Sequence, residues 1–457
     1  MTVETETPTE LLLREDREHL VHPLQDQQQP IVFVRGQGAI LTDSDGKDYL
    51  DGLSCLWNVN VGHGRRELAE VAAAQMEKLA FVTSYAGATN EPAIALASKL
   101  VELAYSNMRA VYFTTGGAES NESAFKTARF YWKAQGRPDK VKFISRVHGY
   151  HGVTMAAASA TGMAAYHKMF APLVPGFVQV APPHPYHWAD YGGAEGDDVG
   201  LAAAAVVEQA IMREGHETVA AVIAEPVMGA GGVIVPPASY FPALREICDR
   251  HDVLLIADEI ITGFCRTGTW FALDHWGVLP DIVSFAKGVT SAYLPLGGIL
   301  LSDRVHAAIT DAPPDLKYMH AATYSGHPTC CAVALRNIDI LEREGLAERA
   351  ATTGRRLLTG LETLREHEAV GDVRGLGMMC GVELVEDRAT RAPAIGLGNK
   401  VAAEARARGL FIRNRGGVGG AYPIGDTLCI APPLITREEE IDRLVSILHD
   451  SIRAATL

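Results

Sequence analysis

The sequence predicts an α/β protein: a large domain with a mostly parallel sheet between layers of helices, and a smaller α+β domain. Two observations predict it. Through the middle of the chain, short runs that are apolar on both faces alternate with long Ala-, Leu- and Glu-rich segments, as in parallel sheets covered on both sides. After about residue 335 the pattern changes to helices interleaved with fewer strands, which indicates the smaller lobe.

The elements are predicted in order along the chain. The segment 42–52 places Asp45-Gly46 between apolar runs, which predicts a hairpin. A calcium loop is the alternative, but Ser54 stands where its terminal Glu is needed. Strands of the large sheet are predicted to begin at Val111, Val141, Val219, Val253, Asp281 and Gly297. In the tail we expect a strand over GMMCGVEL, a helix over 402–408, a strand over LFIR and a final amphipathic helix from Glu438.

Composition and charge exclude several classes of function. The 457 residues carry 41 Lys+Arg against 55 Asp+Glu, a net charge of −14, so no adhesion to nucleic acid or anionic lipid is predicted. The seven cysteines are scattered without a CxxC pair, which predicts reduced thiols and neither a disulfide framework nor a zinc site. No secretory signal and no membrane span are recognised, so we expect a cytoplasmic protein.

Four segments, each expected where a strand meets a loop, offer residues that could carry chemistry. The first, TTGGAESNESAFK (114–126), combines a strand end, a glycine-rich turn and a helix start. Backbone amides at a helix N-terminus, with a partial charge of about +0.5, suit a phosphate. On its own, Gly116-Gly117 fits an ordinary tight turn at least as well, and it matches neither the dinucleotide fingerprint nor the P-loop.

The second segment, HGYHG (148–152), follows a predicted strand. The ring of Tyr150 could stack there on a flat heterocycle, or simply pack at the sheet edge. His148 and His151 stand three apart with no acidic or Cys ligand nearby, and the same holds for His184 and His187. No metal site is therefore predicted.

The third and fourth segments end apolar strands in charged residues. VLLIADEIITGFCRTG places Asp258 at the carboxyl edge of the predicted sheet, where open α/β sheets bind ligands. A buried carboxylate there needs a cationic partner, such as a protonated ring nitrogen or a metal. SFAKGVTSAYLPLGG places Lys287 directly after a strand, where removal from water would lower its pKa and make it a nucleophile.

Together these segments closely resemble the class III, subgroup II aminotransferases, fold type I enzymes that use pyridoxal 5′-phosphate (PLP). The resemblance runs over nearly the whole chain, from DGKDYLDGLSCLWNVNVGHG to IAPPLIT, and the block DE-x-x-TGF-x-RTG followed by S-x-A-K-G is highly specific. It implies a fold type I transferase with a large PLP-binding domain over 71–335. Residues 1–70 would form an N-terminal arm and part of the small domain, and 336–457 the C-terminal small domain.

The resemblance also implies roles for individual residues. Lys287 would bond to the cofactor aldehyde and then move a proton between substrate and cofactor carbons, while Asp258 would pair with the pyridine nitrogen. Residues implied to surround the cofactor are Gly117, Ala118, Tyr150, His151, Glu225, Ile260 and Thr323. Ala118 stands where the family usually has Ser, which removes a hydroxyl contact. Thr323 would reach the phosphate of a neighbouring subunit, so a homodimer or a dimer of dimers with shared active sites is implied.

Three further positions bear on the substrate. Ile261 stands where relatives acting on ornithine, acetylornithine or 4-aminobutyrate usually have Gln, and matches the amine or ω-amino acid:pyruvate members. Trp57 matches a bulky residue of their pocket wall, although plain core packing explains it equally well. In LFIRNRGG, Arg413 aligns better than Arg415 with the family's mobile arginine, which binds a substrate carboxylate.

The sequence therefore predicts a transaminase that moves an amino group from a small-molecule amine or ω-amino acid to pyruvate in two half-reactions. Taurine:pyruvate and putrescine or β-alanine:pyruvate enzymes remain alternatives within the family. A nicotinamide-dependent dehydrogenase is the alternative from another class. It is disfavoured because no Gly-x-Gly-x-x-Gly turn with a following acidic residue is present.

Overall fold

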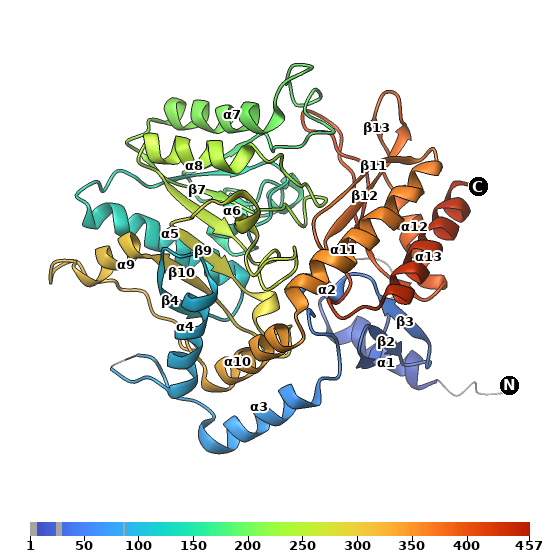
Figure 1. Cartoon of the computed structure of the whole chain (residues 1–457), viewed down its shortest axis with the longest axis horizontal. Helices are drawn as coiled ribbons and strands as arrows, with labels where there is room; N and C mark the ends of the chain where they lie inside the picture. The colour runs from blue at the N-terminus through green and yellow to red at the C-terminus, as the bar shows by residue number, and fades with distance from the viewer. Residues whose placement is uncertain (1–6, 24–29, 86) are drawn as a thin grey trace.

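A seven-stranded sheet forms the centre of the molecule in the computed structural model, which describes residues 7–23, 30–85 and 87–457 (Figure 1). Its strand order is β4-β10-β9-β8-β7-β5-β6. Strands β5 to β9 pair in parallel, and β10 runs antiparallel to both β9 and β4. The strands are β4 (Met108–Thr114), β5 (Lys142–Arg146), β6 (Phe177–Val180), β7 (Val219–Ala224), β8 (Leu254–Asp258), β9 (Ile282–Phe285) and β10 (Gly297–Ser302). The mostly parallel sheet expected from the apolar runs is confirmed.

Helices cover both faces of this sheet because its central strands are apolar on both sides. Along β8, Leu255 belongs to the core on one face and Ile256 to the core on the other. The Ile256 face is covered by α5 (Gly117–Ala134), α6 (Met155–Ala160) and α9 (Asp303–Thr310), and the Leu255 face by α7 (Val199–Glu214) and α8 (Tyr240–Arg250). Helices α3 (Arg66–Leu79) and α4 (Glu91–Leu103) pack against α10 (Pro328–Arg343), and α4 also contacts β4.

The N-terminal part forms a small sheet that is completed from the C-terminal part. After α1 (Pro8–His19), the strands β1 (Phe33–Gln37), β2 (Ile40–Asp43) and β3 (Asp48–Asp51) pair antiparallel, so the predicted hairpin is confirmed. Strand β3 also pairs in parallel with β14 (Leu410–Phe411). Residues far apart in the chain therefore share one sheet, and the short helix α2 (Ser54–Trp57) follows it.

A third sheet of antiparallel strands follows the large one in the chain. It contains β11 (Val370–Gly375), β12 (Cys380–Asp387), β16 (Thr427–Ile430) and β15 (Arg413–Arg415), with β13 (Ala392–Pro393) paired to β12. Helices α11 (Leu346–Glu362), α12 (Leu397–Ala407) and α13 (Glu438–Thr456) pack beside it, in orange and red in Figure 1. The single strand predicted over LFIR is divided at Ile412, because its first half pairs with β3 and its second half with β16. Short 3-10 turns lie at Ala164–Tyr166, Ala272–Trp276, Lys287–Val289 and Thr363–Glu366.

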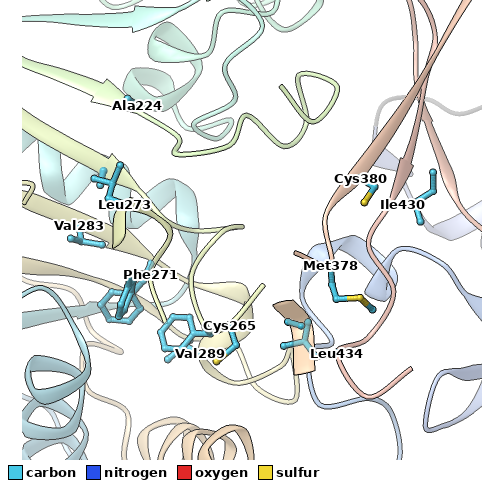
Figure 2. Packing of buried hydrophobic residues seen from close by; sticks show 14 of the residues in the cluster. Ala224, Cys265, Phe271, Leu273, Val283, Val289, Met378, Cys380, Ile430 and Leu434 are labelled. Carbon is cyan, nitrogen blue, oxygen red and sulfur yellow. The ribbon is translucent and has the colours of Figure 1, made fainter. Parts of the chain in front are cut away.

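One buried cluster joins the large sheet to the third sheet. Figure 2 shows Val283 on β9 of the large sheet and Ile430 on β16, with Leu434 drawn between Cys265 and Met378. All five residues belong to the same core cluster. Among the residues that the structure describes, none of the helices has the length and apolar character needed to cross a bilayer.

Candidate active site

Five candidate residues lie on loops that leave the same edge of the large sheet. Gly117 begins α5 just after β4, and Tyr150 follows β5. Glu225 directly follows β7, Asp258 ends β8 and Lys287 comes two residues after β9. Because these strands all run in the same direction, their carboxyl ends meet at one edge, where α/β sheets place their ligand sites.

Asp258 is held in place by three hydrogen-bond donors. Its Oδ2 accepts a bond from Nδ2 of Asn121 at 2.8 Å and lies 2.7 Å from Nδ1 of the buried His151. Its Oδ1 accepts a bond from the backbone N–H of Ile260 at 3.2 Å. Only 3% of Asp258 is exposed. The carboxylate is therefore buried and oriented with lone pairs to spare, which suits a cationic ring nitrogen.

Lys287 combines an unusual backbone with an unpaired side chain. Its φ of +46° lies in the left-handed region, which costs energy for a residue with a Cβ. Burial lowers the pKa of its amine to about 8, although the nearby Asp258 and Glu225 oppose that shift. Among the described residues its Nζ has no hydrogen-bond partner. A neutral amine that is free to attack a carbonyl carbon is therefore accessible near neutral pH.

Glu225 fixes the loop that carries Tyr150. Its Oε1 accepts a bond from the backbone N–H of Tyr150 at 3.0 Å, and its Oε2 accepts one from Gly229 N–H at 2.9 Å. Burial raises the pKa of the Glu225 carboxyl. The Tyr150 ring meets the Tyr166 ring edge-on at a centroid distance of 5.5 Å. Glu225 therefore holds the Tyr150 backbone, and Tyr166 packs against the Tyr150 ring.

The N-terminus of α5 offers a site for an anion. Its N-cap, Gly116, makes no side-chain capping bond, so the first N–H groups of the helix and its dipole remain available. The turn is crowded behind these groups: a Cβ added to Gly117 would lie 2.8 Å from Cδ1 of Ile260, and one added to Gly152 would lie 2.6 Å from Cβ of Ala118. These two glycines permit the close packing of the turn against β8 and the 148–152 loop.

The two candidate arginines on β15 have different surroundings. The side chain of Arg413 makes no hydrogen bond or ion pair within the described chain. Its charge acts on the pKa of both Lys287 and Tyr150, alongside the larger effect of burial. Arg415 is buried, donates to the carbonyl of Gly416 at 2.7 Å and lies 3.1 Å from Nδ1 of His148. Arg413 is therefore free to bind an anionic ligand, whereas Arg415 is committed to the protein.

Trp57 lies where all three sheets meet. It is 2% exposed and belongs to a small apolar cluster. This cluster also contains Ile261 and Cys429, the latter on β16 of the third sheet. Cys429 pairs with Arg413 across β15 and β16. Trp57 is therefore packed in the core, and its cluster lies next to Arg413 through Cys429.

Thr323 is the one candidate residue that the single chain leaves away from this edge. It is exposed on the segment that precedes α10. Neighbouring residues of that segment lie along α5: Tyr318 Oη is 2.7 Å from Thr127 Oγ1, and His320 Nε2 is 2.8 Å from Ser123 Oγ. Its predicted role towards another subunit is not tested by one chain.

Sequence reasoning missed two partners of the site. Asn121 lies within the segment 114–126, on α5 after β4, whereas Asp258 ends β8. Only the folded structure brings the Asn121 amide to Asp258. His148, for which the sequence predicted no metal-binding role, contacts Arg415 from the third sheet. A polar residue one helical turn into α5, on the same face as Gly117, is the signal that could have identified Asn121.

Comparison with known proteins agrees with this geometry. The family model described as "Aminotransferase class-III" matches residues 22–452. The chain belongs to the class III aminotransferases. This aminotransferase is 38% identical to the putrescine–pyruvate aminotransferase of Pseudomonas aeruginosa, over 96% of each chain. It is 39% identical to the diaminobutyrate–2-oxoglutarate transaminase of Halomonas elongata, over 93% of this chain and 90% of that one.

Solved structures of transaminases have the same fold. A thermostable (S)-enantioselective ω-transaminase from Thermomicrobium roseum superposes with a TM-score of 0.91 at 44% identity, covering 99% of both chains. The ω-transaminase of Pseudomonas jessenii in complex with PMP superposes with a TM-score of 0.92 at 38% identity, covering 97% of this chain and 98% of that one. The protein is therefore a fold type I, PLP-dependent aminotransferase of the ω-transaminase group, as its sequence predicts.

The residues present fit this cofactor. The uncapped N-terminus of α5 suits its phosphate, the buried Asp258 suits its ring nitrogen and the unpaired Lys287 amine suits its aldehyde. These are three separate requirements of one ligand, met at one sheet edge.

Proposed function

We propose that this aminotransferase transfers the amino group of a terminal or secondary amine, or of an ω-amino acid, to pyruvate. The observation that carries the proposal is Arg413, whose guanidinium has no partner among the described residues and whose strand pairs it with Cys429 of the Trp57 cluster. A relative named for putrescine and pyruvate, and structural neighbours named ω-transaminases, support it.

Residues of the large sheet would hold the cofactor, which when bound supplies an electron sink for the electron pair left on the substrate carbon after its proton is removed. The first amides of α5, at Gly117 and Ala118, would bind the phosphate. Asp258 would keep the pyridine nitrogen protonated, and His151 with Asn121 would orient that carboxylate.

The other side chains would position the ring and move the proton. Tyr150 would lie over one face of the ring and Ile260 against the other, with Glu225 fixing the Tyr150 backbone. Lys287 would take the proton from the substrate carbon and deliver it to the cofactor carbon. The lowered pKa of Lys287, about 8, lets the same amine accept and give a proton near neutral pH.

The two half-reactions place opposite demands on the pocket, because an amine donor has no carboxylate where pyruvate has one. Arg413 would bind the carboxylate of the keto acid with its planar fork and turn away when the amine enters. Ile261 and Trp57, which share one apolar cluster, would form the pocket wall against an uncharged substituent. A buried Ile at position 261 offers no amide to a second carboxylate, which favours pyruvate over 2-oxoglutarate.

We propose a homodimer, or a pair of dimers, as the active unit. Thr323 is exposed in the single chain, and in a dimer its hydroxyl would bind the cofactor phosphate of the neighbouring subunit. A cytoplasmic location is also proposed, since all seven cysteines are free thiols. A taurine or β-alanine donor remains an alternative, because either anionic group would suit Arg413.

The proposal is tested by mixing the purified yellow holoenzyme with a panel of amines and following loss of the cofactor colour. Pyruvate or 2-oxoglutarate is then added separately to the bleached enzyme. We expect terminal or secondary amines to bleach it and pyruvate to restore the colour. Recovery with 2-oxoglutarate and not with pyruvate would refute the proposed acceptor.

A further inference from the structure

A cysteine, a histidine and an aspartate converge outside the candidate active site. Asp51 ends β3, Cys55 lies in α2 and His63 follows on the next turn. The Oδ2 of Asp51 lies 2.9 Å from Nε2 of His63, and Sγ of Cys55 lies 3.9 Å from the same nitrogen. The three ligand atoms all lie within 4.8 Å of one another. We propose that these three side chains bind one divalent transition-metal ion of the zinc type.

The spacing of the three atoms suits tetrahedral coordination. Zinc bonds of about 2.3 Å to sulfur and about 2.0 to 2.1 Å to nitrogen and oxygen place ligand atoms about 3.6 Å (S to N) and about 3.3 Å (N to O) apart. The corresponding separations here, 3.9 and 2.9 Å, differ from those values by a few tenths of an ångström. The third pair, the Cys55 sulfur and an Asp51 carboxylate oxygen, lies within 4.8 Å.

The polar atoms of the three side chains already bond to one another. Nε2 of His63 pairs with Oδ2 of Asp51, and the Cys55 thiol hydrogen-bonds to Asp51 and lies 3.9 Å from the same His63 nitrogen. Loss of the thiol proton would turn this arrangement into one that presents a sulfur, a nitrogen and an oxygen to a single ion. A carboxylate and a thiol that face one imidazole nitrogen form the ligand set that zinc prefers.

The site is rigid on one side and open on the other. Asp51 is fully buried and accepts backbone N–H bonds from Leu53 at 3.1 Å and from Cys55 at 2.9 Å. The His63 side chain is 15% exposed, and Cys55 is the one cysteine of the seven that is not buried. An ion can therefore enter from solvent and retain a water as its fourth ligand.

Two other ligand clusters in the described residues are weaker candidates. In the group of His184, His187 and Glu383, the guanidinium of Arg374 already binds Glu383 at 2.7 Å, so a cation occupies that position. The group of Glu366, His367 and His449 contains no sulfur and depends on a Glu366 side chain that is 60% exposed. Only the cluster at Asp51 combines a thiol with a fixed carboxylate.

A bound ion would tie β3 and α2 together next to the pocket wall. Ser54, Cys55 and Trp57 all have left-handed φ angles, of 49°, 54° and 55°, so this short segment is strained. Trp57 lies two residues after the sulfur ligand. Coordination would therefore hold the strained segment in the conformation that places Trp57 in its apolar cluster.

The test uses Co²⁺ as a spectroscopic substitute for zinc in the tag-free holoenzyme. Tetrahedral cobalt with a thiolate ligand has intense visible bands at wavelengths longer than those the cofactor absorbs. We expect such bands to saturate at one ion per chain, and to disappear in Cys55→Ser, which is nearly isosteric and preserves the Asp51 backbone bonds. The His449→Gln variant is the matched control and is expected to retain the bands, because it alters only the exposed cluster.

A second readout is stability. Zn²⁺ is expected to raise the thermal unfolding midpoint of the wild-type and His449→Gln holoenzymes but not that of Cys55→Ser, because a ligand that binds only the folded state stabilises it. Weak octahedral cobalt spectra in the wild type, or the same bands and the same zinc-induced shift in Cys55→Ser, would overturn the proposal. His63→Gln gives an independent check and is expected to behave as Cys55→Ser.

Discussion

Lys287 differs from an ordinary surface lysine in both its backbone and its environment. Its left-handed φ and the burial of its amine are imposed by the turn that follows β9, where the chain leaves the apolar strand. Such strain persists only when the surrounding structure holds it, and it is common at functional sites. The sequence predicted the burial from the apolar run before Lys287, but no sequence pattern indicated its backbone conformation.

The lowered pKa of Lys287 makes a pH prediction. Only the neutral amine attacks the PLP aldehyde, so the rate of PLP capture by the apoenzyme should rise as pH increases to about 8 and level off above it. A solvated lysine would continue to gain rate up to about pH 10.4. Stopped-flow absorbance of apoenzyme mixed with PLP measures this profile. A rate that still increases steeply between pH 9 and 10 would show that the amine is not buried.

Arg413 and Arg415 are two residues apart but are expected to respond differently to substitution. A charge-assisted contact of about 2 kcal/mol corresponds to a roughly thirty-fold effect, so Arg413→Ala should slow the pyruvate half-reaction by about that factor and barely change the reaction with a neutral amine. Single-turnover absorbance measures each half-reaction separately. Equal losses for amine and pyruvate would reject the carboxylate-binding role.

Arg415→Ala is the comparison variant. Because Arg415 is buried and contacts His148, its loss should lower stability and affect both half-reactions alike. The sequence alignment favoured Arg413, and the structure adds the physical reason, since Arg415 is already engaged within the protein.

At the scale of elements, a buried ionic network joins the loop after β6 to β12. The fully buried Glu383 contacts Nε2 of His187 at 2.6 Å, Nη1 of Arg374 at 2.7 Å and the backbone N–H of Gly425 at 2.8 Å. The expectation that no acidic residue lies near His187 was wrong. Asp190, three residues along the chain, lies 2.8 Å from Nδ1 of His187, and Glu383 reaches Nε2 of His187 from almost two hundred residues away. Only the packing of the third sheet against this loop brings Glu383 to His187.

Removing the charge of Glu383 should destabilise the fold. Burial alone would raise the pKa of Glu383, but Arg374, His184 and His187 outweigh it and hold that pKa well below its usual range. The carboxylate is therefore ionised at neutral pH. Its stabilisation declines as the pH falls below the unfolded-state pKa of about 4.3 and is gone below the depressed folded-state pKa. Glu383→Gln removes a buried charge that faces Arg374 and His187, leaving them only Asp372 and Asp190 as anionic partners. It should cost about 3 kcal/mol of unfolding free energy in denaturant titrations at neutral pH.

The control for this prediction is Glu366→Gln, at a side chain that is 60% exposed. Surface substitutions of this kind change stability by less than about 0.5 kcal/mol. If the unfolding free energy of Glu383→Gln equalled that of Glu366→Gln, the ionic network would not stabilise the packing of the loop after β6 against β12.

Other elements show which parts of the fold the sequence predicts well. The spacing of apolar residues and the local composition were enough to predict the parallel strands, the hairpin and helix α13. Each of these follows from a local sequence pattern. The pairing of β3 with β14, the division of LFIR and the contact of Asn121 with Asp258 were missed. Each depends on segments that meet only after the whole chain has folded.

At the scale of the whole molecule, the division into domains remains a prediction. The proposed arm and partial small domain over 1–70 is consistent with the pairing of β3 and β14, which joins that region to the C-terminal part. The large domain over 71–335 would contain the whole seven-stranded sheet, and 336–457 the third sheet.

The dimer makes a separate prediction. If Thr323 completes the phosphate site of a neighbouring subunit, holoenzyme should have twice the mass of one chain, or four times for a dimer of dimers, in sedimentation analysis. Thr323→Ala should weaken PLP affinity by a few-fold to ten-fold, because one hydroxyl contact of about 1 kcal/mol is lost. A monomer with full turnover and unchanged cofactor affinity in Thr323→Ala would contradict the shared site.

The central claim is that Lys287 carries the cofactor while Asp258 faces its ring nitrogen. Borohydride reduction of the yellow holoenzyme makes the bond between lysine and cofactor permanent, and mass spectrometry of the digested protein then locates it. We predict one phosphopyridoxyl group per chain, on the peptide that contains Lys287, and none on the Lys287→Ala protein. A label on another lysine, or equal labelling of Lys287→Ala, would contradict the account.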